Sequence, residues 1–90
     1  MRFQAQVLIV LKPDLLDPQG KAVEGSLPAL GWSNVTDVRV GRYVQLDVEA
    51  ADREAALEQV HAMSERLLSN PVIEIYKVLD VDELALEDRP

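Results

Sequence analysis

The chain has 90 residues, no cysteine and a net charge of −7, from nine Lys/Arg against 16 Asp/Glu. A chain this short forms one domain with a thin margin of stability, and the lack of cysteine excludes disulfides, thiolate metal sites and a cysteine nucleophile. The charge is uneven, since residues 1–45 sum to +1 and residues 46–90 to −8, so the second half would repel nucleic acid and anionic membranes.

The N-terminal residues do not resemble a targeting segment. They lack the long apolar core of a signal peptide, and no apolar run in the chain approaches the roughly 18 residues of a membrane span. We therefore expect a cytoplasmic protein that binds neither nucleic acid nor membrane.

Residues 3–11 alternate in hydrophobicity, which predicts a strand with one buried face. The apolar positions are Phe3, Ala5, Val7, Ile9 and Leu11. The opposite face begins with glutamines but continues with Leu8 and Val10. A sheet with helices on one side only would leave Leu8 and Val10 in water, so we expect these two residues to line a homo-oligomer contact.

A helix is predicted to follow, with Asp17 as its N-cap and Pro18 in its first position. Gly31 supplies a left-handed C-terminal position, and Pro28 removes one hydrogen bond late in the helix, so the last turn should bend or loosen. The helix has apolar residues at helical spacing at Val23, Leu27 and Leu30.

The start of this helix, LDPQGKAVEG, has to be weighed as a phosphate-binding loop. Such a loop ends in Gly-Lys-Ser/Thr, but here Gly20-Lys21 is followed by Ala22. The segment is therefore interpreted as a helix start. A glycine inside a helix costs roughly 1 kcal/mol relative to alanine, and the small residues Ala22, Gly25 and Ala29 suggest that another backbone approaches this side closely.

Residues 34–49 are predicted to form a β-hairpin that turns near Gly41. Arg39, Arg42 and Tyr43 would then flank a loop tip. Arginine and tyrosine bury large areas while keeping a hydrogen-bonding end, which suits a protein interface. An ordinary surface hairpin is an equally good interpretation of these residues alone.

A second helix is predicted from Asp52, and Asn70-Pro71 ends it. Its apolar stripe is Ala56, Val60, Met63 and Leu67. A last strand is expected over residues 72–79, followed by an acidic tail over residues 80–90. A short segment of that tail could dock through Val81, Leu84 and Leu86.

The element order β-α-β-β-α-β predicts an α+β, ferredoxin-like fold. We expect an antiparallel sheet packed by two helices and completed by oligomerisation, with a domain over residues 1–79 and the tail over 80–90.

The sequence contains no evident catalytic constellation. His61 is the only histidine, no further ligand lies at metal-binding spacing, and none of the serines sits on a nucleophile elbow. Three classes of function remain: a regulatory α+β domain that binds a small molecule, a non-catalytic subunit of a larger enzyme, and a small stand-alone enzyme. The missing catalytic residues weigh against the third.

Four segments, in order along the chain, resemble the PurS family, the small subunit of phosphoribosylformylglycinamidine synthase in purine biosynthesis. They are VLKP with LDPQG (residues 10–13 and 16–20), LGW (30–32), VRVGRY (38–43) and LLSNPVIE (67–74). The resemblance runs from the first strand to about Tyr76, and Pro28 departs from it.

The resemblance implies a subunit with no catalytic residue, metal site or cofactor of its own. In such complexes a glutaminase releases ammonia and a large subunit, which uses ATP and Mg, joins it to formylglycinamide ribonucleotide. The small subunit would bridge the two, assist ammonia transfer and form a homodimer or larger oligomer. With exposure arguments, it suggests a partner-subunit interface at Asp17, Gln19, Gly20, Lys21, Arg39, Arg42 and Tyr43.

Overall fold

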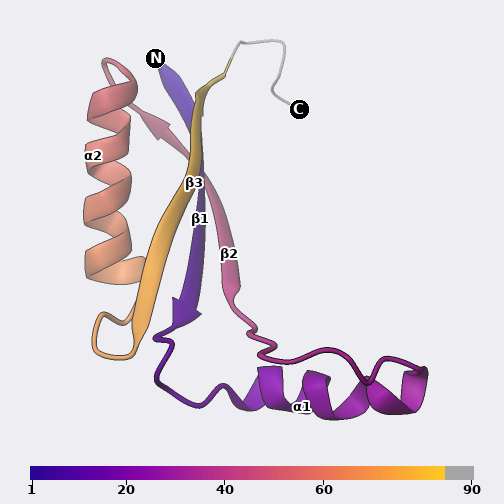
Figure 1. The fold of residues 1–90 in the computed structure, drawn as a ribbon. Coiled ribbons are helices and arrows are strands. Elements are labelled where there is room, and N and C mark those ends of the chain that lie inside the picture. Colours follow the sequence, from indigo (N-terminus) through magenta and orange to yellow (C-terminus); the bar gives the residue numbers. More distant parts are fainter. Residues whose placement is uncertain (85–90) are drawn as a thin grey trace.

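The computed structural model describes residues 1–84, which form a three-stranded antiparallel sheet with two helices (Figure 1). The strands are β1 (Arg2–Leu11), β2 (Arg42–Glu49) and β3 (Glu74–Glu83), in the order β2-β1-β3. The helices are α1 (Pro18–Ser26) and α2 (Arg53–Met63), continued by a 3-10 turn η1 (Pro28–Leu30) and a π-helical turn η2 (Ser64–Leu68). The predicted α+β class with an antiparallel sheet is confirmed.

The core lies between β1 and α2. The alternating residues Phe3, Ala5, Val7 and Ile9 are at most 2% exposed, as the alternation of residues 3–11 predicts. Val48 of β2, Val81 of β3, and Ala56 and Val60 of α2 complete this core. Side chains at every second position of a strand share a face, so one face of the sheet is covered by α2.

The C-terminal turn of the second helix differs from its prediction. Asp52 caps α2 by accepting a hydrogen bond from the N–H of Ala55, and Ala56 and Val60 are buried as expected. Leu67 is 82% exposed, however, so its place in the predicted core stripe is wrong. The π-helical turn η2 inserts extra backbone per turn, which shifts the register and brings Leu68 to the core instead.

The predicted hairpin over residues 34–49 is wrong in its first strand. Only residues 42–49 form a strand, while residues 35–41 have no strand partner. Their backbone groups are bound by side chains of the preceding helix, because the N–H of Val40 donates to Asp17 Oδ2 at 2.8 Å and that of Val38 to Glu24 Oε1 at 3.3 Å. The outer edge of β2, where residues 35–41 would have paired, therefore has no strand partner within residues 1–84.

Helix α1 does not pack on the sheet, so only one of the two helices covers it. Figure 1 shows α1 projecting from the end of the sheet where β1 finishes, on the side opposite α2. The radius of gyration, 16.8 Å, exceeds the roughly 12 Å of a compact domain of this length. We call α1, η1 and the return segment, residues 17–41, the arm. Within the arm the predicted N-cap, Pro28 break and left-handed Gly31 (φ 105°) are all present.

The last strand is longer than predicted and takes up the start of the predicted tail. β3 continues through residues 80–83, with Val81 fully buried and Phe3 paired with Glu83. A boundary at residue 79 therefore falls inside a strand. The expectation for Leu86 lies outside the described residues. None of the helices in residues 1–84 is long and apolar enough to cross a membrane.

Candidate protein interface

No helix or loop of residues 1–84 covers the face of the sheet turned away from α2, and we call it the open face. Its central row is set by the register of β1, in which Leu8 lies between Tyr43 of β2 and Lys77 of β3. Val10 lies next to Ile75. Tyr43 and Ile75 are 54% and 45% exposed, so this end of the open face presents apolar side chains to water.

Tyr43 was predicted at a loop tip and instead lies on the sheet. Because the hairpin is absent, Tyr43 belongs to β2 and stands beside Leu8, the residue predicted to line a homo-oligomer contact. Its hydroxyl donates to Gln45 Oε1 at 3.2 Å. Tyr43 therefore shares a surface with Leu8 and Val10 rather than with the arm.

The other end of the open face is polar and acidic. Gln6 lies between Gln45 and Asp80, and Gln4 between Asp47 and Asp82. A hydrogen bond with Asp80 and its negative charge raise the pKa of Asp82. The sequence pattern showed the two glutamines but not the carboxylates beside them, because strand register decides those neighbours.

Asp17 joins the start of α1 to the return segment of the arm. It is 4% exposed, and its carboxylate accepts the N–H of Gly20 and the N–H of Val40, each at 2.8 Å. These two hydrogen bonds, with the charge of Arg39 at 4.0 Å, hold the pKa of Asp17 below its usual value against the opposing effect of burial. One side chain thus caps α1 and fixes the chain where it enters β2.

Gly20 is buried at the same junction, because the carbonyl of Val38 occupies the space that a Cβ would need. Its N–H already donates to Asp17, so it is not available to a phosphate group. The exclusion of a phosphate loop is consistent with this geometry. Gln19 and Lys21, its neighbours, are exposed.

Arg39 and Arg42 are both engaged within the chain. Arg39 donates to the carbonyl oxygens of Lys12 and Leu15, each at 2.9 Å. Arg42 forms an ion pair with Glu74 at 2.9 Å and donates to the carbonyl oxygen of Leu68 at 3.0 Å. Both arginines therefore tie the arm and the turns to the sheet, which the sequence could not show.

The N–H of Asn70 and the charge of Arg42 lower the pKa of Glu74, although its partial burial acts in the opposite direction. Glu74 thus joins the start of β2, the end of η2 and the start of β3.

The arm exposes large apolar side chains that no described residue covers. Val23, Leu30 and Trp32 are between 44% and 67% exposed. The predicted close approach at Gly25 is not made by any of residues 1–84, since a Cβ there would meet nothing within 4 Å. The sequence showed Val23 and Leu30 as part of a helical stripe but not that α1 leaves the sheet.

A small polar network lies between α2 and β3. Tyr76 donates to Glu65 at 3.2 Å, and its oxygen lies 2.9 Å from His61 Nδ1. Burial and the charge of Glu65 raise the pKa of Tyr76. In residues 1–84 no group of three or more His, Asp and Glu side chains is placed to hold a metal ion.

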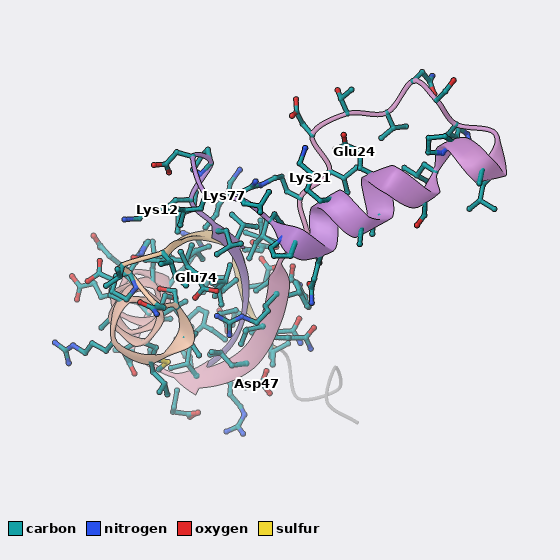
Figure 2. The ribbon with its side chains drawn as sticks, turned by 90° about the horizontal axis from the view of Figure 1, so that it is seen from below. Lys12, Lys21, Glu24, Asp47, Glu74 and Lys77 are labelled. Atoms are coloured by element: carbon teal, nitrogen blue, oxygen red, sulfur yellow. The ribbon has the colours of Figure 1, made fainter. Side chains whose placement is uncertain are left out.

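Figure 2 looks along the sheet from the end where the arm begins. In this view Lys12 and Lys77 lie close to each other, and Asp47 lies away from them near β2. The site is thus an extended surface made of the open face and the arm. Its exposed rings, aliphatic chains and separated charges suit contact with other proteins.

Comparisons with known proteins give one consistent result. The family model described as PurS, phosphoribosylformylglycinamidine (FGAM) synthase, matches residues 4–82. The chain is 39% identical over 85 residues to the synthase subunit PurS of Bacillus subtilis, which covers 94% of this chain and 99% of that one. It is 40% identical over 74 residues to the same subunit of Synechocystis, covering 82% and 74%.

Solved structures agree. Thermus thermophilus PurS superposes with a TM-score of 0.84 and 45% identity over 94% of this chain and 100% of that one. A chain of a structure described as PurLQS from Thermotoga maritima superposes with a TM-score of 0.80 and 33% identity, covering 87% and 95%.

Proposed function

This chain belongs to the PurS family, and from that membership we propose that it is the small, non-catalytic subunit of phosphoribosylformylglycinamidine synthase in purine biosynthesis. The observation that carries the proposal is the family match over residues 4–82, nearly the whole described chain. The similarity to a chain of PurLQS supports the proposal that this chain acts within a complex of several subunits.

The reaction divides between subunits. A glutaminase releases ammonia from glutamine, and a large subunit uses ATP and Mg to join the ammonia to formylglycinamide ribonucleotide. Ammonia in water at neutral pH becomes ammonium and loses its nucleophilicity, so transfer between the two sites needs an enclosed route. The proposed work of this chain is to bridge the two subunits in the cytoplasm and help to enclose that route.

The partner subunits are proposed to contact the arm and its junction with the sheet. Gln19 and Lys21 are exposed there and would touch a partner directly. Asp17, Gly20, Arg39 and Arg42 would act by holding the arm in place, since each is engaged within the chain. The exposed Trp32 extends this surface along the arm.

A homodimer or larger oligomer is proposed to form on the open face through Leu8 and Val10, with Tyr43 beside them. These side chains lie together on the sheet, with the exposed Ile75 next to Val10. Covering these side chains on association would remove apolar surface from water, which stabilises the oligomer by about 25 cal/mol for each Å² buried.

Co-purification tests complex membership. The tagged chain is bound to a resin and exposed to extract of its source cells at low salt, and the eluate is assayed for glutaminase and for ATP-dependent FGAM synthesis. We expect both activities in the eluate and neither from a resin that carries an unrelated acidic protein. An eluate without either activity would contradict the proposal.

A further inference from the structure

Strand β3 forms one outer edge of the sheet, because within residues 1–84 it pairs only with β1. The backbone groups of an antiparallel edge strand point alternately toward the neighbouring strand and outward. The N–H of Lys12 on β1 donates to the carbonyl oxygen of Ile73, so every second residue from Ile73 bonds to β1 up to the bulge that follows Val78. Tyr76 and Val78 therefore turn their N–H and C=O groups outward, away from β1.

The chain closes this edge at both ends with its own groups. Near the start of β3, the N–H of Glu74 donates to the carbonyl oxygen of Asn70 at 2.7 Å. Beyond the bulge, the N–H of Val81 donates to Asp80 Oδ1 at 2.9 Å, and Arg53 Nε donates to the carbonyl oxygen of Val81 at 3.0 Å. Groups that are occupied in this way cannot pair with an added strand.

The middle of the edge is open. The outward backbone groups of Tyr76 and Val78 have no hydrogen-bond partner among residues 1–84. They border a groove of about 520 Å³ between β3 and α2, to which α2 contributes Arg53, Leu57 and His61, and we call it the edge groove. An edge strand with unpaired N–H and C=O groups is a ready site for the addition of another strand.

A second copy of the chain fits this edge poorly. Two β3 strands would use the outward groups of both residues only in the antiparallel register that sets Tyr76 of each copy opposite Val78 of the other. Lys77 would then lie directly opposite Lys77 of the second copy. Like charges that lie directly opposite in an antiparallel pair are destabilising. The open edge is therefore better suited to a different chain.

The charges of the edge groove indicate what such a chain should carry. Two of the three side chains that α2 contributes, Arg53 and His61, are basic or can become so, and Leu57 lies between them along the helix. The carboxylate in the groove, that of Asp80, already accepts the N–H of Val81. A carboxylate of an added strand would meet opposite charge on the α2 side, which favours binding.

We propose that an extended segment of a catalytic subunit adds to β3 at Tyr76 and Val78, with an acidic side chain turned toward Arg53 and His61. The proposal rests on the proposed function, which requires contacts with other subunits, and it adds a contact that is separate from the arm. Backbone hydrogen bonds to β3 would supply affinity, and the edge groove would select the side chains of the segment.

Amide hydrogen exchange tests the strand pairing on the unmodified chain. The isotope-labelled chain is exchanged in D₂O alone and in complex with the purified glutaminase and large synthetase subunits, and each amide is then measured by NMR after the complex is dissociated. We expect the amides of Tyr76 and Val78 to exchange at least about tenfold more slowly in the complex. The amide of Val81 already donates to Asp80, so it should change by less than about threefold.

A proline substitution tests the same contact by removing one donor. Val78→Pro deletes an N–H that the chain does not use in its own sheet, and edge strands tolerate proline where the N–H faces outward. Val78→Ala is the matched control, since it shortens the side chain but keeps the N–H. We expect Val78→Pro to raise the dissociation constant for the catalytic subunits, measured by sedimentation, at least about tenfold above that of Val78→Ala.

The outcomes separate this site from the proposed function. Unchanged exchange at Tyr76 and Val78 in a complex that forms, slowing that is equal at Val81, or equal binding by the two variants would overturn the edge-groove site and leave the proposed function standing. Failure of the chain to form any complex would contradict both. Circular dichroism establishes that each variant is folded, and the exchange measurement decides alone if Val78→Pro is not.

Discussion

Two glycines of the same helix provide a matched test at the scale of single residues. A methyl group at Gly20 would overlap the carbonyl oxygen of Val38, so Gly20→Ala has to separate α1 from the return segment that leads into β2. We expect it to lower the free energy of unfolding by about 1–3 kcal/mol, the usual cost of overpacking. Thermal or urea unfolding measures this.

Gly25→Ala is the control, because a methyl group there meets nothing within 4 Å and alanine is the better helix former. It should raise the free energy of unfolding by up to about 1 kcal/mol. Equal effects of the two substitutions would show that the contact between Gly20 and Val38 does not hold the arm.

Asp17 gives the protein a pH-dependent stability. Its folded pKa lies below the usual value of 3.8, because two backbone N–H groups and Arg39 stabilise the carboxylate. A lowered pKa contributes stability that is complete above the usual value and is lost as the pH falls through the folded value. Asp17→Asn should therefore lower the melting temperature at neutral pH by roughly 4–8 °C, and by less under acidic conditions.

Asp14→Asn is the matched control for this measurement, since Asp14 is exposed. It should leave the melting temperature within about 2 °C of the wild type across the same pH range. A loss in Asp17→Asn that is equally large at pH 2 and pH 7 would contradict the role of the charge.

Sequence alone predicted one of the two structural roles of Asp17, the N-cap of α1, but not its hydrogen bond to the return segment. The Asp-Pro pair predicts an N-cap, because both residues favour the first turn of a helix. The second hydrogen bond of its carboxylate goes to Val40, 23 residues further on. No local pattern encodes such a distant partner, and the structural roles of Arg39 and Arg42 were missed for the same reason.

At the scale of elements, the spacing of apolar residues correctly predicted the strand and the helix that pack against each other within the chain. The alternation of residues 3–11 gave β1 and its buried face, and the stripe at Ala56 and Val60 gave α2. The prediction failed over residues 34–41, because Val38 and Val40 have the period of a strand but their backbone groups bind to α1. It failed at Leu67 because a π-helical turn changes the period within the helix.

The two apolar faces of β1 lead to a prediction for the open face. Leu8→Glu places a charge in the middle of the proposed homo-oligomer contact, beside Tyr43 and Lys77. We expect the dimer dissociation constant, measured by sedimentation, to rise at least about tenfold, which corresponds to roughly 1.4 kcal/mol or more. Folding should be kept, because Leu8 lies on the uncovered side of the sheet.

Leu67→Glu makes the same chemical change away from the open face, at a side chain that is 82% exposed. It should leave this dissociation constant unchanged. If both variants weaken the dimer equally, the contact does not lie on the open face.

At the scale of the whole molecule, the chain is more extended than a compact domain of the same length. Its radius of gyration of 16.8 Å reflects an arm that no part of residues 1–84 covers, and an uncovered sheet face. Both features fit a protein whose work is to connect others. The sequence predicted the uncovered face through Leu8 and Val10, but not the projecting arm, because helix periodicity does not say what a helix packs against.

The most direct test of the central claim compares two nitrogen donors in FGAM synthesis by the purified glutaminase and large synthetase subunits, with and without this chain. If the chain bridges the two subunits, synthesis from glutamine should require it, while synthesis from high concentrations of ammonia should proceed nearly as well without it. Synthesis from glutamine at the full rate in its absence would contradict the account.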